Sequence, residues 1–118
     1  MNKCSKIIAT IILIVTSQSY FSQSNFSKYN EEAYYHYQQD DYVNAIKKFS
    51  KALEFKNEVA NGYKVADTYI NRGNCRRMLM NYESAQQDFD EALRLKPEYV
   101  KVYLVKSSSY ISSSQFQN

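Results

Sequence analysis

The 118-residue chain contains only two glycines and one proline, and its 15 basic and 12 acidic side chains give a formal net charge of +3. An all-β fold needs glycine and proline in its many turns, so this composition argues against that class and favours helices with few connections. Lys3 and Lys6 lie in a segment that we expect to be removed, and the remaining charge of +1, from 13 basic and 12 acidic side chains, indicates neither nucleic acid nor a membrane surface as a partner.

Residues 1–24 have the layout of a secretory signal peptide. A basic start, Met1–Lys6, precedes an apolar run from Ile7 to Val15, and small and polar residues follow at 16–24. A transmembrane helix needs roughly 20 apolar residues, and this run is about half that length. We expect cleavage at about residues 19–24, after Ser19 or a few residues later, and a periplasmic or secreted protein. The alternatives are an uncleaved N-terminus that anchors the chain in the membrane, or a buried first helix.

The two cysteines do not form a disulfide framework. Cys4 precedes the apolar run, so it does not occupy the place of the lipid-bearing cysteine of a lipoprotein, and removal of the leader leaves Cys75 alone. One cysteine cannot make an internal disulfide, so the fold must depend on its core. No histidine or set of metal ligands lies near Cys75 in the sequence, and we interpret it as a small buried apolar residue rather than a reactive thiol.

Two segments of the chain, 42–57 and 82–97, repeat one another at a constant offset of 40 residues. Five identities lie on one face of the predicted helix: Tyr42 with Tyr82, Ala45 with Ala85, Phe49 with Phe89, Ala52 with Ala92, and Leu53 with Leu93. In each copy the alanines, the phenylalanine and the leucine recur at i, i+4, i+7 and i+8, which predicts one apolar stripe along a helix. We expect the polar residues between them, Asp88 included, to solvate the outer face, and Pro97 to end the second helix.

Each of these segments follows another predicted helix, Phe26–Gln39 before the first and Ala66–Leu79 before the second. Gly73 pairs with Ala33 at the same offset. A glycine inside a helix costs roughly 1 kcal/mol relative to alanine, so Gly73 indicates that a partner helix approaches closely there. The helices break at Asp40-Asp41 and at Met80-Asn81, and Asp41 is placed to cap the helix that begins at residue 42.

Residues 66–97, ADTYINRGNCRRMLMNYESAQQDFDEALRLKP, resemble a tetratricopeptide repeat, with these matching elements at the family's spacing: Tyr69, Gly73, Tyr82, Ala85, Phe89, Ala92 and Pro97. Residues 26–57 are similar, with Ala33 where glycine is usual and Asn57 where proline is usual. Residues from Val100 look like the first helix of a third repeat. The resemblance implies an all-α fold, a right-handed α-solenoid of about two and a half antiparallel helix pairs. Its units would be repeat 1 at 26–57, repeat 2 at 66–99, and a partial third repeat or capping helix at 100–115.

The sequence departs from the family in two ways. The family's period is about 34 residues, whereas the offset here is 40; the extra residues fall near Asn57 to Tyr63 and form either a loop or a lengthened helix. Arg72 and Arg76 stand where the family more often has apolar or aromatic residues. We expect their stems to pack while their charged ends reach water.

No catalytic constellation is evident in the sequence. His36 is the only histidine, and we interpret it as a packing residue on the inward side of its helix. No cluster of histidine, cysteine and carboxylate has the spacing of a metal site, and Gly62 and Gly73 stand too far apart for a phosphate-binding loop. We therefore expect no enzyme, no metal or cofactor, no small-molecule substrate and no nucleic-acid partner.

The resemblance implies a concave groove, lined by the first helix of each pair, that binds a peptide or protein segment. Helical phase assigns these residues to it: Asn30, Tyr34, Tyr37, Ile70, Asn74, Arg77, Lys101 and Leu104. Asn74 would fix a peptide backbone and Arg77 a carboxylate. Some family members clamp a C-terminal carboxylate in this way, but Asn30 stands where such a clamp would prefer a lysine. The alternative is that these are merely solvated polar side chains.

Two functions remain open at this point. The first is an interaction module or scaffold that binds a peptide or protein segment in the groove. The second is a structural subunit that completes its helical stack by self-association through the C-terminal helix, or by docking in an envelope complex. The apolar stripe of that helix, which includes Tyr103 and Ile111, is the feature that suggests the second.

Overall fold

The computed structural model describes residues 3–11 and 23–116 of the chain, and the expected cleavage positions up to residue 22 lie outside these ranges. Residues 3–11 are helical. The rest of the described chain forms five α-helices and one short 3-10 helix: α2 (Asn25–Gln38), α3 (Tyr42–Glu54), η1 (Lys56–Glu58), α4 (Gly62–Met78), α5 (Tyr82–Leu95) and α6 (Val100–Phe116). None of the helices in the described ranges is both long enough and apolar enough to cross a membrane.

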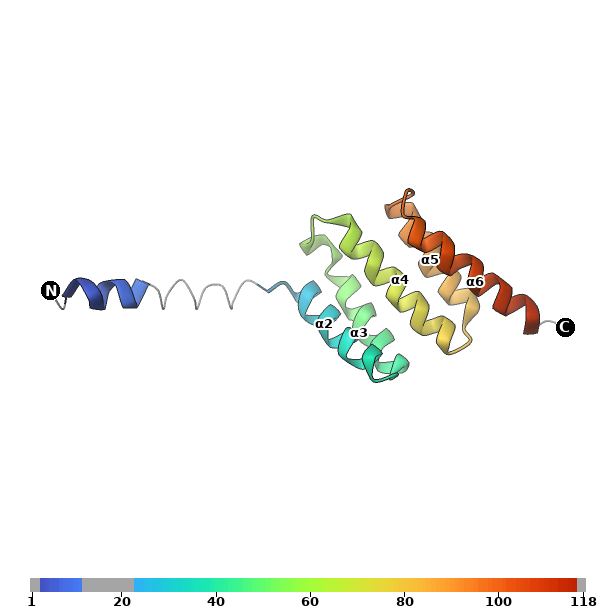
Figure 1. Cartoon of the computed structure of the whole chain (residues 1–118), viewed down its shortest axis with the longest axis horizontal. Helices are drawn as coiled ribbons and strands as arrows, with labels where there is room; N and C mark the ends of the chain where they lie inside the picture. The colour runs from blue at the N-terminus through green and yellow to red at the C-terminus, as the bar shows by residue number, and fades with distance from the viewer. Residues whose placement is uncertain (1–2, 12–22, 117–118) are drawn as a thin grey trace.

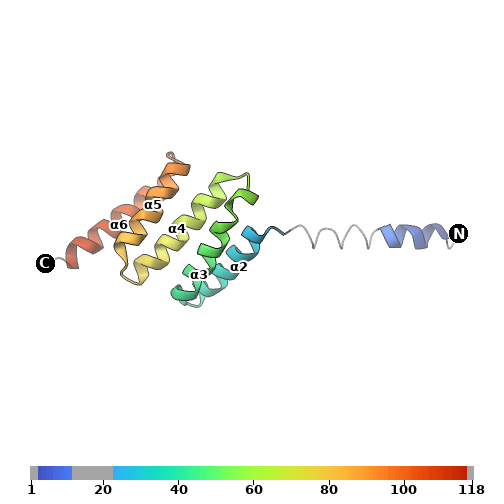
Figure 2. The same cartoon turned by 180° about the vertical axis from the view of Figure 1, so that it is seen from behind.

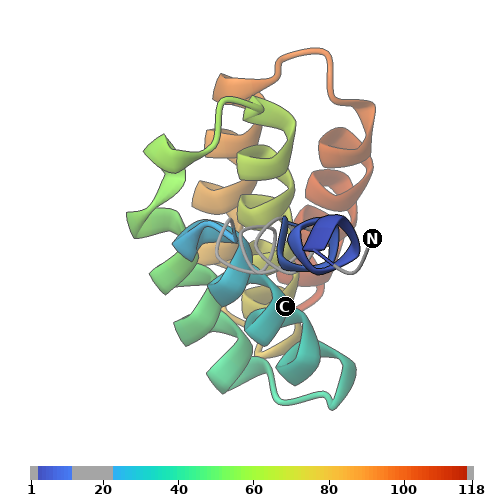
Figure 3. The same ribbon diagram turned by 90° about the vertical axis from the view of Figure 1, so that its left-hand side faces the viewer.

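The helices pack as neighbouring pairs, which confirms the predicted all-α class. Figures 1 and 2 show α2 with α3, then α4 with α5, then α6, following one another along the stack. The strongest contacts are those within the pairs, and α3 with α4 and α5 with α6 join the pairs to one another. Figure 3 looks along this stack from its N-terminal end. The arrangement is that of a tetratricopeptide-like helical repeat.

The two turns inside the pairs have the same geometry. Asp40 and Met80, 40 residues apart, both adopt left-handed backbone, with φ of 56° and 63°. The N–H of Asp41 donates to the carbonyl of His36 (3.0 Å), and the N–H of Asn81 donates to that of Arg76 (2.8 Å), which is the pattern that closes a helix with a Schellman motif. Asp41 then caps α3 and Asn81 caps α5, so the breaks lie where the sequence predicts them.

Small residues lie at the centre of each pair. The four alanines of the two stripes, Ala45, Ala52, Ala85 and Ala92, are fully buried, as are Phe49 and Phe89. A β-carbon added at Gly73 would lie 2.6 Å from Cε1 of Phe89, which is closer than real side chains approach. Gly73 therefore lets α4 and α5 come together over that ring, as its place in the repeat predicts.

Asp88 corrects the expectation that it solvates the outer face. Its side chain is 3 % exposed and accepts hydrogen bonds from Arg72 (2.7 Å from Nη2) and Arg76 (2.9 Å from Nη1). Arg72 Nη1 also donates to the hydroxyl of Ser50 on α3 (3.1 Å). The two arginines are one turn apart on α4 and reach the same carboxylate, so their charged ends turn inward to it. The expectation that these ends reach water was wrong.

The extra residues between the repeats form both a loop and a longer helix. After α3, η1 and the short segment Val59–Asn61 lead to α4, which begins at Gly62. The side chain of Asn61 caps α4 by accepting from the N–H of Tyr63 (3.0 Å). Helix α4 thus starts four residues before the predicted Ala66, about one helical turn earlier.

Candidate protein-binding groove

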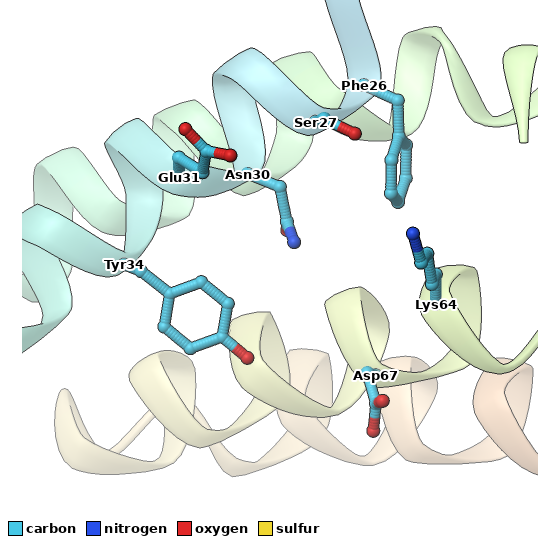
Figure 4. Close-up of a pocket in the computed structure, with 7 residues that line it drawn as sticks. All are labelled: Phe26, Ser27, Asn30, Glu31, Tyr34, Lys64 and Asp67. Atoms are coloured by element: carbon cyan, nitrogen blue, oxygen red, sulfur yellow. The ribbon is translucent and has the colours of Figure 1, made fainter. Parts of the chain in front are cut away.

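A hollow of about 250 Å³ lies between the first helices of the two pairs. Figure 4 shows side chains from α2 and α4 around it: Phe26, Ser27, Asn30, Glu31 and Tyr34 from α2, and Lys64 and Asp67 from α4. Asn30 and Tyr34 are two of the residues that helical phase assigns to the groove. The hollow therefore lies on the face where the sequence analysis expects a ligand.

Hydrogen bonds between α2 and α4 fix these two side chains in place. The hydroxyl of Thr68, fully buried, lies 3.0 Å from Asn30 Oδ1. Asn71 Nδ2 donates to the hydroxyl oxygen of Tyr34 (2.6 Å). The ring of Tyr34 also meets that of Phe49 edge-on, with 5.7 Å between the centroids. Because rotamers held in this way lose little freedom when a ligand binds, the hollow is pre-organised.

The charges around the hollow are of both signs. Lys64 is cationic and Glu31 is anionic, and the carboxylate of Asp67 accepts a hydrogen bond from the hydroxyl of Tyr99. That bond, followed by desolvation, raises the pKa of Tyr99 to about 12. Burial also raises the pKa of Tyr34 above its usual value. Both phenols are therefore neutral at physiological pH, and the hydroxyl of Tyr34, which lines the hollow, is a hydrogen-bonding group there.

Further along α4, Asn74 and Arg77 lie one turn apart on the same helix. Both side chains are half-buried. Among the described residues, Asn74 Oδ1 and Arg77 Nε are buried atoms without a hydrogen-bond partner. One is an acceptor and the other a donor, which are the two groups that complement a peptide unit.

The structure places the other predicted groove residues differently. Ile70 is fully buried, in one apolar cluster with Phe26 of α2 and Val102 of α6. Its side chain therefore offers no surface to a ligand, and this corrects the prediction that it lines the groove. Tyr37 is half-buried and meets Tyr42 edge-on, with 6.0 Å between the ring centroids.

Lys101 and Leu104 belong to α6, but their side chains lie outside those that the structure describes. Five residues of the hollow were absent from the prediction, namely Phe26, Ser27, Glu31, Lys64 and Asp67. A signal for two of them was present: Ser27 precedes Asn30 by three residues, and Asp67 precedes Ile70 by three, so both continue the same helical stripe.

His36 and Cys75, the two residues weighed as catalytic or metal-binding groups, both lie in structural positions. His36 Nδ1 lies 3.0 Å from Asp41 Oδ2, so the imidazole supports the turn between α2 and α3. Cys75 is fully buried, as predicted, and this burial raises the pKa of its thiol to about 12. In the described part of the chain, no group of three histidine, cysteine or carboxylate residues is placed to hold a metal ion.

Comparison with known proteins identifies the family. The family model described as tetratricopeptide repeat matches residues 25–98, which is more than half of the chain. Comparison with curated proteins gives no significant match. Tetratricopeptide repeats are typically protein-interaction modules without enzymatic activity. With its paired helices, small residues at their crossing and this match, the chain belongs to the tetratricopeptide repeat family.

Proposed function

We propose that the protein is exported and acts as an interaction module or scaffold that holds a peptide or extended protein segment against α2, α4 and α6. The hollow between α2 and α4, with Asn30 and Tyr34 fixed on its wall, is the observation that carries this proposal. The unpaired atoms of Asn74 and Arg77 support it. A buried polar atom without a partner costs about 1–3 kcal/mol. Because both atoms are closed to solvent in this structure, the proposal includes an outward turn of these two side chains, after which a peptide backbone supplies an N–H for Asn74 and a carbonyl for Arg77.

The test is a selection of random peptides displayed on phage against the purified mature protein, followed by calorimetry with the selected peptides. We expect Tyr34→Ala, and separately Asn74→Ala combined with Arg77→Ala, to weaken binding about ten-fold or more, as substitution of anchoring residues does. Tyr35→Ala is the matched control, since Tyr35 is the neighbouring tyrosine on α2 and is 64 % exposed. Peptides that bind all these variants equally well, or a selection that enriches none, would refute groove binding.

Export is supported by the layout of residues 1–24 and is tested separately. The side chain of Ser24 caps α2 by accepting a hydrogen bond from the N–H of Ser27 (3.1 Å), and a cap of this kind contributes about 1 kcal/mol. Cleavage after Ser19 or Ser22 leaves the cap on the mature chain, whereas cleavage after Ser24 removes it. We therefore expect the mature N-terminus at residues 20–23, in the periplasm or medium. Intact-mass measurement of the fractionated protein checks this, and a cell-associated, full-mass chain indicates the uncleaved anchor instead.

One observation favours the structural alternative. On α6, Tyr103 is 52 % exposed and Ile111 is 58 % exposed, so part of this last helix presents apolar surface that a second chain or an envelope complex could cover. Sedimentation velocity over a range of concentrations tests self-association. A dimer that dissociates on Ile111→Ser supports the alternative, and a monomer at all concentrations excludes self-association through α6.

A further inference from the structure

We propose that the insertion between the repeats forms a second binding pocket, which takes a partner segment that carries an aliphatic side chain beside carboxylates. A cavity of about 220 Å³ lies between the inserted residues and the end of α5. We call it the insertion pocket and define it by six of its lining residues: Lys56, Val59, Gly62, Val65, Arg94 and Leu95. It goes beyond the proposed function, because it shares no residue with the hollow between α2 and α4.

The two sites use different faces of α4. Lys64 and Asp67 line the hollow, whereas Gly62 and Val65 line the insertion pocket. Neighbouring helical residues point about 100° apart, so these two pairs of positions, each spaced by three, lie on separate faces. The insertion creates its pocket directly, because Val59 belongs to the loop and Gly62 and Val65 belong to the added turn of α4.

The interior of the insertion pocket is apolar. Val65 is 5 % exposed, and Val59 and Leu95 are partly buried and pack against the larger core cluster. An apolar cavity of about 150 Å³ can hold a benzene molecule, so this volume accommodates the side chain of a leucine. Removing such a side chain from water is favourable, so an aliphatic group suits the buried part of the ligand.

The charged residues among those that line the insertion pocket are both cations. Lys56 and Arg94 line it, and the side chain of Lys96 reaches the pocket's edge, because its Cε lies 3.0 Å from the place of a β-carbon at Gly62. The acid beside them is Glu91, whose pKa is lowered by hydrogen bonds from Arg94 and by the charge of Lys56.

Two other carboxylates of this region are engaged elsewhere. Glu58 accepts from Asn25 Nδ2 (3.2 Å) and from the N–H of Phe26 (3.4 Å), and Glu98 accepts from the hydroxyl of Tyr63 (2.8 Å). These carboxylates keep their charge but lie outside the lining of the insertion pocket, which contains the cations Lys56 and Arg94 and no carboxylate. Complementary charge selects a ligand with carboxylates next to its aliphatic side chain.

The test uses three short peptides and the mature, isotopically labelled protein in amide chemical-shift titrations. The peptide N-acetyl-Glu-Leu-Glu-amide should shift the amides of Val59, Gly62 and Leu95. We expect N-acetyl-Lys-Leu-Lys-amide to bind at least about ten-fold more weakly, because its charges repel the rim. N-acetyl-Glu-Gly-Glu-amide, which lacks the aliphatic side chain, should give no saturable shift at these amides.

Charge-reversal variants then locate the site. Lys56→Glu should weaken binding of the Glu-Leu-Glu peptide at least about five-fold, whereas Lys47→Glu, an equivalent reversal at an exposed lysine of α3, should change it by less than about two-fold. Tyr34→Ala should leave binding intact, because it alters only the hollow. Equal binding of the acidic and basic peptides, equal effects of the two reversals, or loss of binding in Tyr34→Ala would each overturn the proposal.

Discussion

Gly73 lets α4 and α5 approach each other at the ring of Phe89, which is itself fully buried. The equivalent position of the first pair is Ala33, which is also fully buried, in a cluster with Phe49. A methyl group is thus accommodated in one pair and not in the other. The two copies of the pattern therefore differ in the room that the opposite ring leaves for a side chain at this position.

We predict that Gly73→Ala lowers the free energy of unfolding by up to about 2 kcal/mol. Alanine is the better helix former by about 1 kcal/mol, but forcing a methyl group against a buried ring costs about 1–3 kcal/mol, and the ring atoms at 2.6–3.1 Å have little room to move. Urea denaturation measures the change. Ala33→Gly is the companion variant, and it should lose about 1 kcal/mol for the opposite reason. Higher stability of Gly73→Ala would mean that the Phe89 ring moves aside.

The groove residues show which side-chain positions the sequence can predict and which it cannot. Asn30 and Tyr34, which helical phase assigns to the groove, both line the hollow, because one helix and its period suffice to decide which way they point. Helical phase also assigns Ile70 to the groove. Its side chain is nevertheless buried, in one cluster with Phe26 and Val102 from two other helices. Burial at such positions depends on contacts between residues more than 30 positions apart, and no local pattern encodes those contacts.

At the scale of the element, the repeat predicts four helices with boundaries that are close to those observed. Helix α2 runs over Asn25–Gln38, against the predicted Phe26–Gln39, and α5 ends at Leu95, two residues before Pro97. The sequence left the added first turn of α4 open between a loop and a lengthened helix, because Gly62 and Tyr63 interrupt the apolar stripe and the turn has no counterpart in the first repeat. The sequence feature that indicates a helix start at Gly62 is Asn61, because asparagine is favoured at helix N-caps.

Helices α4 and α5 are joined by the ion pairs of Asp88, and this gives a second prediction. Asp88→Asn leaves the guanidinium groups of Arg72 and Arg76 largely buried without a counter-charge, with side chains 16 % and 22 % exposed. Breaking such a pair should lower the free energy of unfolding by about 2–4 kcal/mol. Asp90→Asn is the matched control, because Asp90 pairs with Lys106 at the surface, where a pair contributes about 0–1 kcal/mol. Equal urea midpoints for the two variants would contradict a structural role for Asp88.

The cap of α3 provides a prediction on pH. Hydrogen bonds from Asn44, and then from His36, lower the pKa of Asp41 below its usual value. A carboxyl group whose pKa is lower in the folded state stabilises the fold above its unfolded pKa of about 3.9 and loses this contribution as the pH falls through its folded value. Asp41→Asn keeps a capping side chain but cannot titrate. Thermal unfolding should therefore show a variant that is less stable at pH 7 and loses less stability in acid, so that the two proteins converge at low pH; parallel pH profiles would contradict this.

In the whole molecule, α4 is the helix on which the others converge. It packs against α3, α5 and α6, and it is joined to α2 by the bonds of Thr68 and Asn71. Helix α6, by contrast, packs mainly on α5 and contains many serines, which are mediocre helix formers. The stability of local regions in repeat proteins follows such nearest-neighbour contacts.

We therefore predict a gradient of amide hydrogen exchange along the stack. Amides in the centre of α4 should be the most protected and should exchange only on global unfolding, and those in the last two turns of α6 should exchange first. Mass spectrometry of exchanged peptides, on the mature protein under native conditions, measures this. Equal protection of α4 and of the end of α6 would show that the stack opens as one unit, contrary to the prediction.

The unequal links between the helix pairs have a consequence for any long ligand. Seven residues, 55–61, connect α3 to a lengthened α4, whereas only four, 96–99, connect α5 to α6. The stack therefore does not advance in identical steps, and a filament or peptide with a regular repeat of its own would match one step and drift out of phase at the next. On the proposed binding face, the contacts would therefore be irregularly spaced. The lengths of the connections between the helix pairs, rather than any one side chain, would determine which extended molecules fit along the stack.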